Sequence, residues 1–143
     1  MTQGISHITL IVRDLDRMEE ILVAVLGAQK IYDSGEDTFS LSRERFFLVG
    51  DKQPVWFAIM EGERLPFRSY NHIAFKIDEA EIGPCLNAIE RLGLDLRDGR
   101  SRVSGEGQSI YFYDDDNHMF ELHTGTLEDR LKRYAEGLGR KTV

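Results

Sequence analysis

The chain has 143 residues, of which 41 % are apolar and 30 % charged, the composition of one soluble globular domain of ordinary size. Its 25 acidic and 18 basic side chains give a net charge of −7, which argues against a general nucleic-acid binder because phosphate contacts require clustered Lys and Arg. No run approaches the roughly 20 apolar residues of a membrane span, and the N-terminus lacks the pattern of a secretory signal. Cys85 is the single cysteine, so no internal disulfide is possible and we expect a small cytoplasmic protein.

An internal repeat organises the chain. Residues 6–13 and 71–77 are both β-type runs with a histidine at the second position. Each run is followed by apolar residues at helical spacing that end at a glycine, Gly27 in the first copy and Gly93 in the second. Pro84 should lie in the first turn of the second helix, because proline is tolerated there but not deeper.

Short strand candidates follow each helix. They are residues 29–32, 38–41, 46–49 and 55–60 in the first half, and 94–97, 109–113 and 118–123 in the second. The Asp-Asp-Asp-Asn run at 114–117 is a hairpin turn by composition. Thr126 and Asp129 have the spacing of a capping box that opens a last helix, from 127 to about 138.

These elements predict two βαβββ units, at about 5–63 and 70–125, followed by a helical tail within a single domain covering 1–143. The strands late in each unit are joined by short turns, which favours antiparallel hairpins. The sequence therefore favours the α+β class over a doubly wound parallel sheet.

The two repeated histidines are candidate metal ligands. His7 and His72 occupy equivalent positions, so they converge on one point if the units pack about a pseudo-twofold axis. Two imidazoles with one carboxylate form a common divalent-metal set that keeps positions open. Glu121 lies between Phe120 and Leu122, and alternation turns it to the opposite strand face, where an unpaired carboxylate is costly. A metal ion is one partner that satisfies Glu121, and an arginine is the alternative.

Three further positions bear on such a site. Aligning the last strands of the two units by Phe57 puts Ala58 opposite Glu121, so the first unit supplies no fourth ligand and the site stays open. Residues 97–109 carry three arginines, three serines and three glycines, which suits a cradle for a small anion as well as it suits a flexible solvated loop. By pattern alone, Glu44 is a solvated turn residue between two strand candidates.

Four segments closely resemble the fosfomycin-resistance proteins of the FosX type, which are epoxide hydrolases of the vicinal oxygen chelate superfamily. The segments are residues 6–9, 39–44, 68–77 and 109–126, and the resemblance runs from about residue 5 to 138. The bare His-His-Glu set is shared by the whole superfamily. The runs around Glu44, His72 and Glu121 are much more specific.

The resemblance implies a cup-shaped mixed sheet in a homodimer whose paired units exchange between subunits. It implies Mn(II), one per subunit, held by His7, His72 and Glu121, and it assigns Glu44 as the general base that activates water to open the epoxide of fosfomycin. The implied substrate contacts are Thr9, Trp56, Arg102, Ser109, Tyr111 and Arg130. Arg100 is the alternative to Arg102. The stretch 52–55, in the turn before Trp56, is about three residues longer than usual, so the assignment of Trp56 depends on the shape of this turn.

Three other functions remain open. A thiol transferase of the same superfamily, using glutathione or bacillithiol, would lack the acid found at Glu44. A drug-sequestering protein like the bleomycin-binding members would lack the metal set. A glyoxalase-, epimerase- or dioxygenase-like enzyme would share the ligands but not the sequence contexts of Glu44 and His72. Another epoxide or phosphonate also remains open as the physiological substrate.

Overall fold

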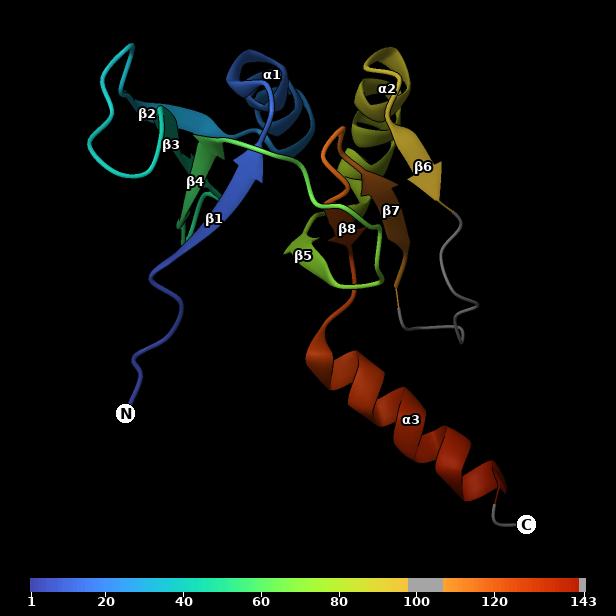
Figure 1. The fold of residues 1–143 in the computed structure, drawn as a ribbon. Coiled ribbons are helices and arrows are strands. Elements are labelled where there is room, and N and C mark those ends of the chain that lie inside the picture. Colours follow the sequence, from blue (N-terminus) through green and yellow to red (C-terminus); the bar gives the residue numbers. More distant parts are fainter. Residues whose placement is uncertain (98–106, 142–143) are drawn as a thin grey trace. The chain divides into compact units, whose positions relative to one another are not determined.

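The computed structural model describes residues 1–97 and 107–141, and these form two compact units (Figure 1). Unit 1 consists of Met1–Ser69 and Asp114–His118, and unit 2 consists of Tyr70–Tyr113 and Met119–Val143. Each unit contains one four-stranded mixed sheet with a helix against one face. Within the described ranges, every helix is too short or too polar to cross a bilayer.

Unit 1 begins with the predicted strand and helix. Its elements are β1 (His7–Val12), α1 (Leu15–Leu26), β2 (Gln29–Asp33), β3 (Glu44–Val49) and β4 (Val55–Glu61). The strand order is β1-β4-β3-β2, with β1 parallel to β4 and the other pairs antiparallel. This is the βαβββ arrangement predicted from the sequence.

Helix α1 has caps at both ends. The Asp14 side chain accepts a hydrogen bond from the Arg17 N–H at 3.0 Å, which satisfies a donor in the first turn. Gly27 ends the helix with a φ of 64°, a left-handed conformation that glycine adopts without steric cost. The apolar side of α1 packs on the sheet, and its buried residues are Leu15, Met18, Ile21, Leu22 and Val25.

Unit 2 repeats this topology. Its elements are β5 (His72–Lys76), the short 3-10 turn η1 (Glu79–Glu81), α2 (Ile82–Arg91), β6 (Asp95–Arg97), β7 (Ser109–Tyr113), β8 (Met119–His123) and α3 (Leu127–Lys141). The strand order is β5-β8-β7-β6, with β5 parallel to β8. Pro84 lies in the first turn of α2, as predicted. Burial raises the pKa of the Cys85 thiol on α2, which makes it a poor nucleophile.

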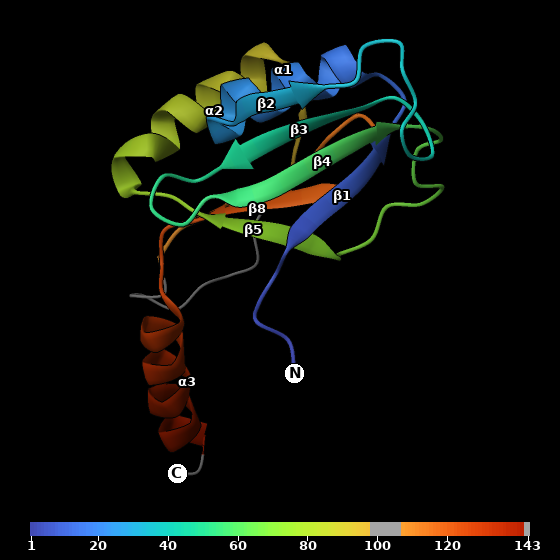
Figure 2. The ribbon, with the colours of Figure 1, turned by 90° about the vertical axis from the view of Figure 1, so that its left-hand side faces the viewer.

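Helix α3 starts at the predicted capping box. The Asp129 N–H donates to Thr126 Oγ1 at 3.1 Å, and that hydroxyl donates to Asp129 Oδ2 at 2.7 Å. In both ribbon views α3 extends away from the sheet of its own unit (Figures 1 and 2). Its apolar residues Leu127, Leu131 and Tyr134 are correspondingly exposed.

The structure differs from the sequence prediction between β2 and β3. Residues 38–41 form no strand, and residues 39–41 are bends, although polar and apolar residues alternate there. Phe39 and Leu41 are 75 % and 87 % exposed, so no packed face rewards the alternation. Strand β3 begins at Glu44 instead, and Glu44 is therefore a sheet residue rather than a turn residue.

The turn between β7 and β8 belongs to unit 1. Asp114 accepts hydrogen bonds from the backbone N–H groups of Asp116 and His118, and its other oxygen lies 2.7 Å from His118 Nδ1. Arg13 donates from both its backbone N–H and its Nε to Asp116. Asn117 completes the turn with a φ of 70°. These bonds hold the predicted hairpin turn in one conformation.

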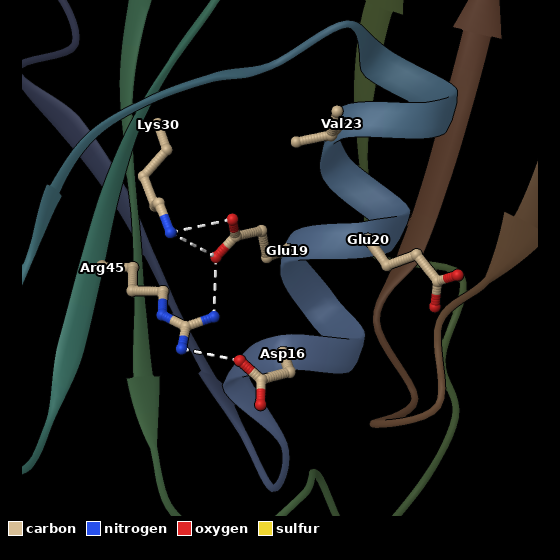
Figure 3. Close-up of a pocket in the computed structure, with 6 residues that line it drawn as sticks. All are labelled: Asp16, Glu19, Glu20, Val23, Lys30 and Arg45. Carbon is tan, nitrogen blue, oxygen red and sulfur yellow. Dashed lines mark hydrogen bonds and ion pairs between the residues drawn. The ribbon is translucent and has the colours of Figure 1, made fainter. Parts of the chain in front are cut away.

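Arg45 joins β3 to α1 and β2 on the helix-covered side of the first sheet. Its guanidinium nitrogens lie 2.7 Å from Asp16 and 2.6 Å from Glu19 (Figure 3). They also lie 2.9 Å from Asp33. The side chain is 15 % exposed and lines an open surface pocket with Asp16, Glu19 and Lys30. A hydrogen bond from the Gly35 N–H, together with the charges of Arg45 and Lys30, lowers the pKa of the Asp33 carboxyl.

Replacing Arg45 with Leu should destabilise the fold by about 1–3 kcal/mol at neutral pH, because it leaves carboxylates without their shared cation. A carboxyl with a lowered folded-state pKa contributes stability above its unfolded value of about 3.9 and loses it as the pH falls. The deficit of the variant should therefore shrink in acid. Urea unfolding at pH 7 and at about pH 3 measures this.

Arg43→Leu is the matched control, because Arg43 pairs with Glu36 and Glu61 in more exposed positions. It should lower the unfolding midpoint less than Arg45→Leu. Equal effects of the two variants, or a deficit that is unchanged in acid, would show that the Arg45 cluster does not stabilise the sheet in this way.

Candidate metal centre and active site

One face of the first sheet, the face away from α1, collects the predicted residues of unit 1. Register pairs His7 with Trp56 and Thr9 with Ala58 between the parallel strands β1 and β4. Side chains of paired residues point to the same side, and alternation carries this row onto β3. Glu44 reaches the same face, because Arg45 beside it contacts α1 on the opposite one.

His7 lies against an aromatic wall. Its ring centroid is 4.2 Å from that of Trp56, and Trp56 meets Phe46 edge-on at 5.2 Å. Ser6 Oγ is 3.1 Å from His7 Nδ1, so the other ring nitrogen, Nε2, is directed away from the Ser6 hydroxyl. Within the described part of the chain, the buried indole N–H of Trp56 has no hydrogen-bond partner. A ligand in front of this wall would meet one unused donor and one imidazole nitrogen.

Glu44 is 9 % exposed, and its backbone is held firmly. Its N–H donates to Ser34 Oγ at 3.0 Å, and the Ser34 N–H donates to the Glu44 carbonyl at 3.0 Å. The flanking arginines pair with other acids, Arg43 with Glu61 and Arg45 with the α1 carboxylates. Among residues 1–97 and 107–141 no hydrogen bond or ion pair to the Glu44 carboxylate was found. A buried acid without a partner is costly and marks a candidate functional group.

In unit 2, His72 and Glu121 come together across the parallel strands β5 and β8. His72 Nε2 lies 2.9 Å from Glu121 Oε2, and Glu121 is almost fully buried. His72 Nδ1 lies 2.7 Å from the carbonyl oxygen of Tyr70, and a carbonyl can only accept. Nδ1 is therefore the protonated nitrogen, and Nε2 presents a lone pair in the neutral ring.

This pair fits a cation. A neutral Nε2 and a carboxylate oxygen are both acceptors, so their close approach calls for a proton or a metal ion between them. Two bonds of about 2.1 Å meeting near a right angle would hold the donor atoms about 3 Å apart, which is close to the 2.9 Å between His72 and Glu121. Within the described residues of one chain, no group of three acids, histidines or cysteines forms a complete metal site. His7, the third predicted ligand, belongs to unit 1.

The remaining predicted substrate contacts are two neutral residues on β7 and two arginines. Ser109 and Tyr111 lie on β7, on the same face as Glu121, and Tyr111 pairs with Glu121 in register. The Tyr111 ring is 5.5 Å from that of His72 and its hydroxyl is 3.3 Å from that of Tyr70. Arg130 lies in the first turn of α3 and is partly exposed. Arg102 and its alternative Arg100 lie outside the described residues.

Comparisons with known proteins identify the family. The sequence profile of the Glyoxalase/Bleomycin resistance protein/Dioxygenase superfamily matches residues 4–122. The fosfomycin resistance protein FosX of Mesorhizobium japonicum is 61 % identical over 138 residues, which are 96 % of this chain and 97 % of that protein. This chain belongs to the FosX-type proteins of that superfamily.

Solved structures and a more distant relative extend the FosX comparison. A FosX variant from Listeria monocytogenes, crystallised with Mn(II) and 1S,2S-dihydroxypropylphosphonic acid, matches with a TM-score of 0.82 and 50 % identity over 94 % of this chain and 99 % of that chain. The metallothiol transferase FosB of Staphylococcus saprophyticus is 34 % identical over 140 residues, 95 % of this chain and 86 % of that protein. The α+β fold with two four-stranded mixed sheets and a C-terminal helix is thereby confirmed as that of FosX structures.

Two residues of this FosX-type site escaped the sequence reasoning. Tyr70 supplies the carbonyl that orients His72, a backbone role that no residue type reveals. His123 lies 3.5 Å from Glu121 and 2.7 Å from Ser109 Oγ. Strand alternation already puts His123 on the Glu121 face, and that was the available signal for it.

Proposed function

We propose that this chain hydrolyses the epoxide ring of fosfomycin to a vicinal diol, and so gives antibiotic resistance, with Mn(II) as its cofactor. The observation that carries the proposal is the buried, unpartnered carboxylate of Glu44 within the described residues of a chain 61 % identical to a FosX protein. A group with this environment is suited to accept a proton. The Mn(II) and dihydroxypropylphosphonic acid in the Listeria FosX structure also support it.

His7, His72 and Glu121 would hold the metal ion. When bound, a divalent ion supplies Lewis-acid polarisation of the epoxide oxygen. The neutral Nε2 of His72 and Oε2 of Glu121 are the donor types that such an ion takes, and their 2.9 Å separation suits neighbouring ligands of one ion. Ala58, the register partner of Thr9, brings no further ligand from unit 1.

Glu44 would take a proton from the attacking water. The water oxygen forms a bond to an epoxide carbon while the ring C–O bond breaks. The released oxygen takes up a proton from solvent and becomes the second hydroxyl of the diol, and Glu44 returns its proton to solvent. Neither a thiol nor a redox partner is needed. Candidate substrate contacts are the neutral groups Thr9, Trp56, Ser109 and Tyr111 and the cations Arg102 and Arg130, which would balance the phosphonate charge in an acidic protein.

A domain-swapped homodimer would complete the site. The first strands of both units have an exposed face, which carries His7 and Thr9 on β1 and His72 on β5. Large apolar side chains such as Phe39 and Leu41 are also exposed in a single chain. A second copy of the chain is the partner that covers such surfaces at low cost. The single buried cysteine, Cys85, fits a cytoplasmic location.

The experiment that tests the function is incubation of the protein with Mn(II) and fosfomycin in the absence of thiol, followed by phosphorus NMR. We expect a diol product from the wild type. Glu44→Gln keeps the shape of the side chain but removes the proton acceptor, so kcat should fall by roughly 10²–10⁴-fold. Glu61→Gln is the matched control on β4, because Glu61 pairs with Arg43, and its kcat should be unchanged.

Two outcomes would contradict this proposal. Near-normal diol formation by folded, metal-loaded Glu44→Gln would remove Glu44 as the base. Turnover that requires glutathione or bacillithiol, with a thiol adduct as product, would instead indicate a transferase like the FosB relatives.

The metal ligands predict a loss of affinity. His72→Ala removes a direct donor, so Mn(II) binding measured by titration calorimetry on metal-free protein should weaken by at least about 100-fold. Glu44→Gln is the control here and should bind Mn(II) as the wild type does. A His72→Ala protein with wild-type stoichiometry and affinity would exclude His72 as a ligand.

The dimer predicts a particular complementation. Light scattering should give twice the 16.4 kDa chain mass. If each site takes His7 from one subunit and His72 from its partner, mixing the inactive His7→Ala and His72→Ala proteins after unfolding should restore about a quarter of wild-type activity, through mixed dimers with one intact site. No recovery in verified mixed dimers would show that each site comes from one chain.

A further inference from the structure

Glu121 has a second set of contacts besides His72. Ser109 Oγ lies 2.5 Å from Glu121 Oε1, and the same oxygen of Ser109 lies 2.7 Å from His123 Nδ1. Ser109 and His123 are register partners on the antiparallel strands β7 and β8, two residues along from the Tyr111 and Glu121 pair. The side chains of Glu121 and His123 are 5 % and 14 % exposed, so water competes poorly for these bonds.

Counting protons fixes the direction of the chain of bonds. The Ser109 hydroxyl has one hydrogen, and the Glu121 carboxylate at 2.5 Å can only accept it. The remaining close contact of the hydroxyl oxygen must then be accepted from the His123 Nδ1–H. His123 Nδ1 also lies 3.5 Å from Glu121 Oε1, but the Ser109 oxygen is its nearer acceptor. Donation therefore runs from His123 to Ser109 and from Ser109 to Glu121.

The two oxygens of Glu121 are thereby given different surroundings. Oε1 accepts from Ser109, whereas Oε2 faces His72 Nε2 at 2.9 Å. A carboxylate anchored through one oxygen presents the other to an ion in one orientation, without loss of rotamer freedom on binding.

We propose that His123 is a positioning residue which acts through Ser109 to hold Oε1 of Glu121, and so reserves Oε2 for the divalent ion shared with His72. This rests on the metal centre of the proposed function. It adds His123 to the site and gives Ser109 an orienting role towards the metal ligand. In unit 1 the positions equivalent to Ser109 and His123 are Glu44 and Met60, which cannot form this relay.

The first test is Mn(II) affinity, measured by titration calorimetry on metal-free protein, with the electron paramagnetic resonance spectrum of bound Mn(II) as a second readout. Ser109→Ala and His123→Ala should each weaken binding by about 10–100-fold, the usual effect of removing an outer partner of a ligand. Both should also change the spectrum, because the carboxylate is no longer fixed. Ser109→Thr keeps the hydroxyl and His123→Asn keeps an N–H donor, so both should bind within about threefold of wild type.

The second test asks whether His123 acts through Ser109. If it does, the Ser109→Ala/His123→Ala double variant should bind Mn(II) within about twofold of Ser109→Ala alone. Two independent effects would multiply instead. Thr124→Val is the matched control, because the Thr124 hydroxyl at the same hairpin end bonds to the Gln108 N–H and not to Glu121. It should leave affinity and spectrum unchanged.

The outcomes separate the relay from the function on which it rests. Wild-type affinity and spectrum in Ser109→Ala, or multiplicative losses in the double variant, would overturn the relay while fosfomycin turnover by the wild type stands. A wild-type protein that binds no Mn(II) would overturn the metal centre and the relay together. Weak binding by Ser109→Thr and His123→Asn as well as by the alanine variants would show a general packing defect, and would also overturn the relay.

Discussion

A carboxylate placed inside an apolar strand needs partners, and the second unit is built around that requirement. Phe120 and Leu122, which flank Glu121 on β8, are almost fully buried on the side of α2, so alternation leaves Glu121 on the other face. Its partners arrive from both neighbouring strands, His72 from β5 and Ser109 from β7. The sheet register is therefore what supplies this buried carboxylate with partners.

The two units use one topology for different chemistry. In both units the first strand carries a histidine and lies parallel to the last strand, β4 or β8. The other neighbour of that last strand, β3 or β7, is antiparallel to it. Ala58 in unit 1 stands where Glu121 stands in unit 2, and Glu44 stands where Ser109 stands. Within the described residues, the Glu44 carboxylate of unit 1 has no bonded partner, whereas the Glu121 carboxylate of unit 2 contacts His72 and Ser109. Under the proposed function, Glu44 exchanges a proton and Glu121 holds a cation, and these two roles need such opposite surroundings.

Much of the fold could be predicted because it depends on local physics. The helix that ends at Gly27, the capping box at Thr126 and the strand at 109–113 each follow from residues close together in the sequence. The error at 38–41 has the opposite origin, because an alternating segment becomes a strand only if a neighbour pairs with it. The alternation of residues within a segment does not show whether another strand lies beside it.

In the candidate site, too, the features that depend on local sequence could be predicted, and those that depend on strand pairing could not. The equivalence of His7 and His72 could be read from the repeat, and the carboxylate at Glu121 from alternation. The bonds of Ser109 to both Glu121 and His123 depend on the register across the β7–β8 hairpin. That register is set by the length and conformation of the turn 114–118, which the sequence predicts as a turn but not as a fixed offset.

Glu44 and Arg45 show how stability and chemistry coexist in adjacent residues. Strand alternation separates them onto two faces, so the cation that three carboxylates hold on the α1 side does not neutralise the acid on the other. Ser34 fixes the Glu44 backbone through two hydrogen bonds, one from the Glu44 N–H and one to the Glu44 carbonyl. The cost of burying an unpartnered carboxylate is thus offset by interactions one residue away. That arrangement fixes the Glu44 backbone while leaving its carboxylate without a bonded partner among the described residues, as the proposed general base requires.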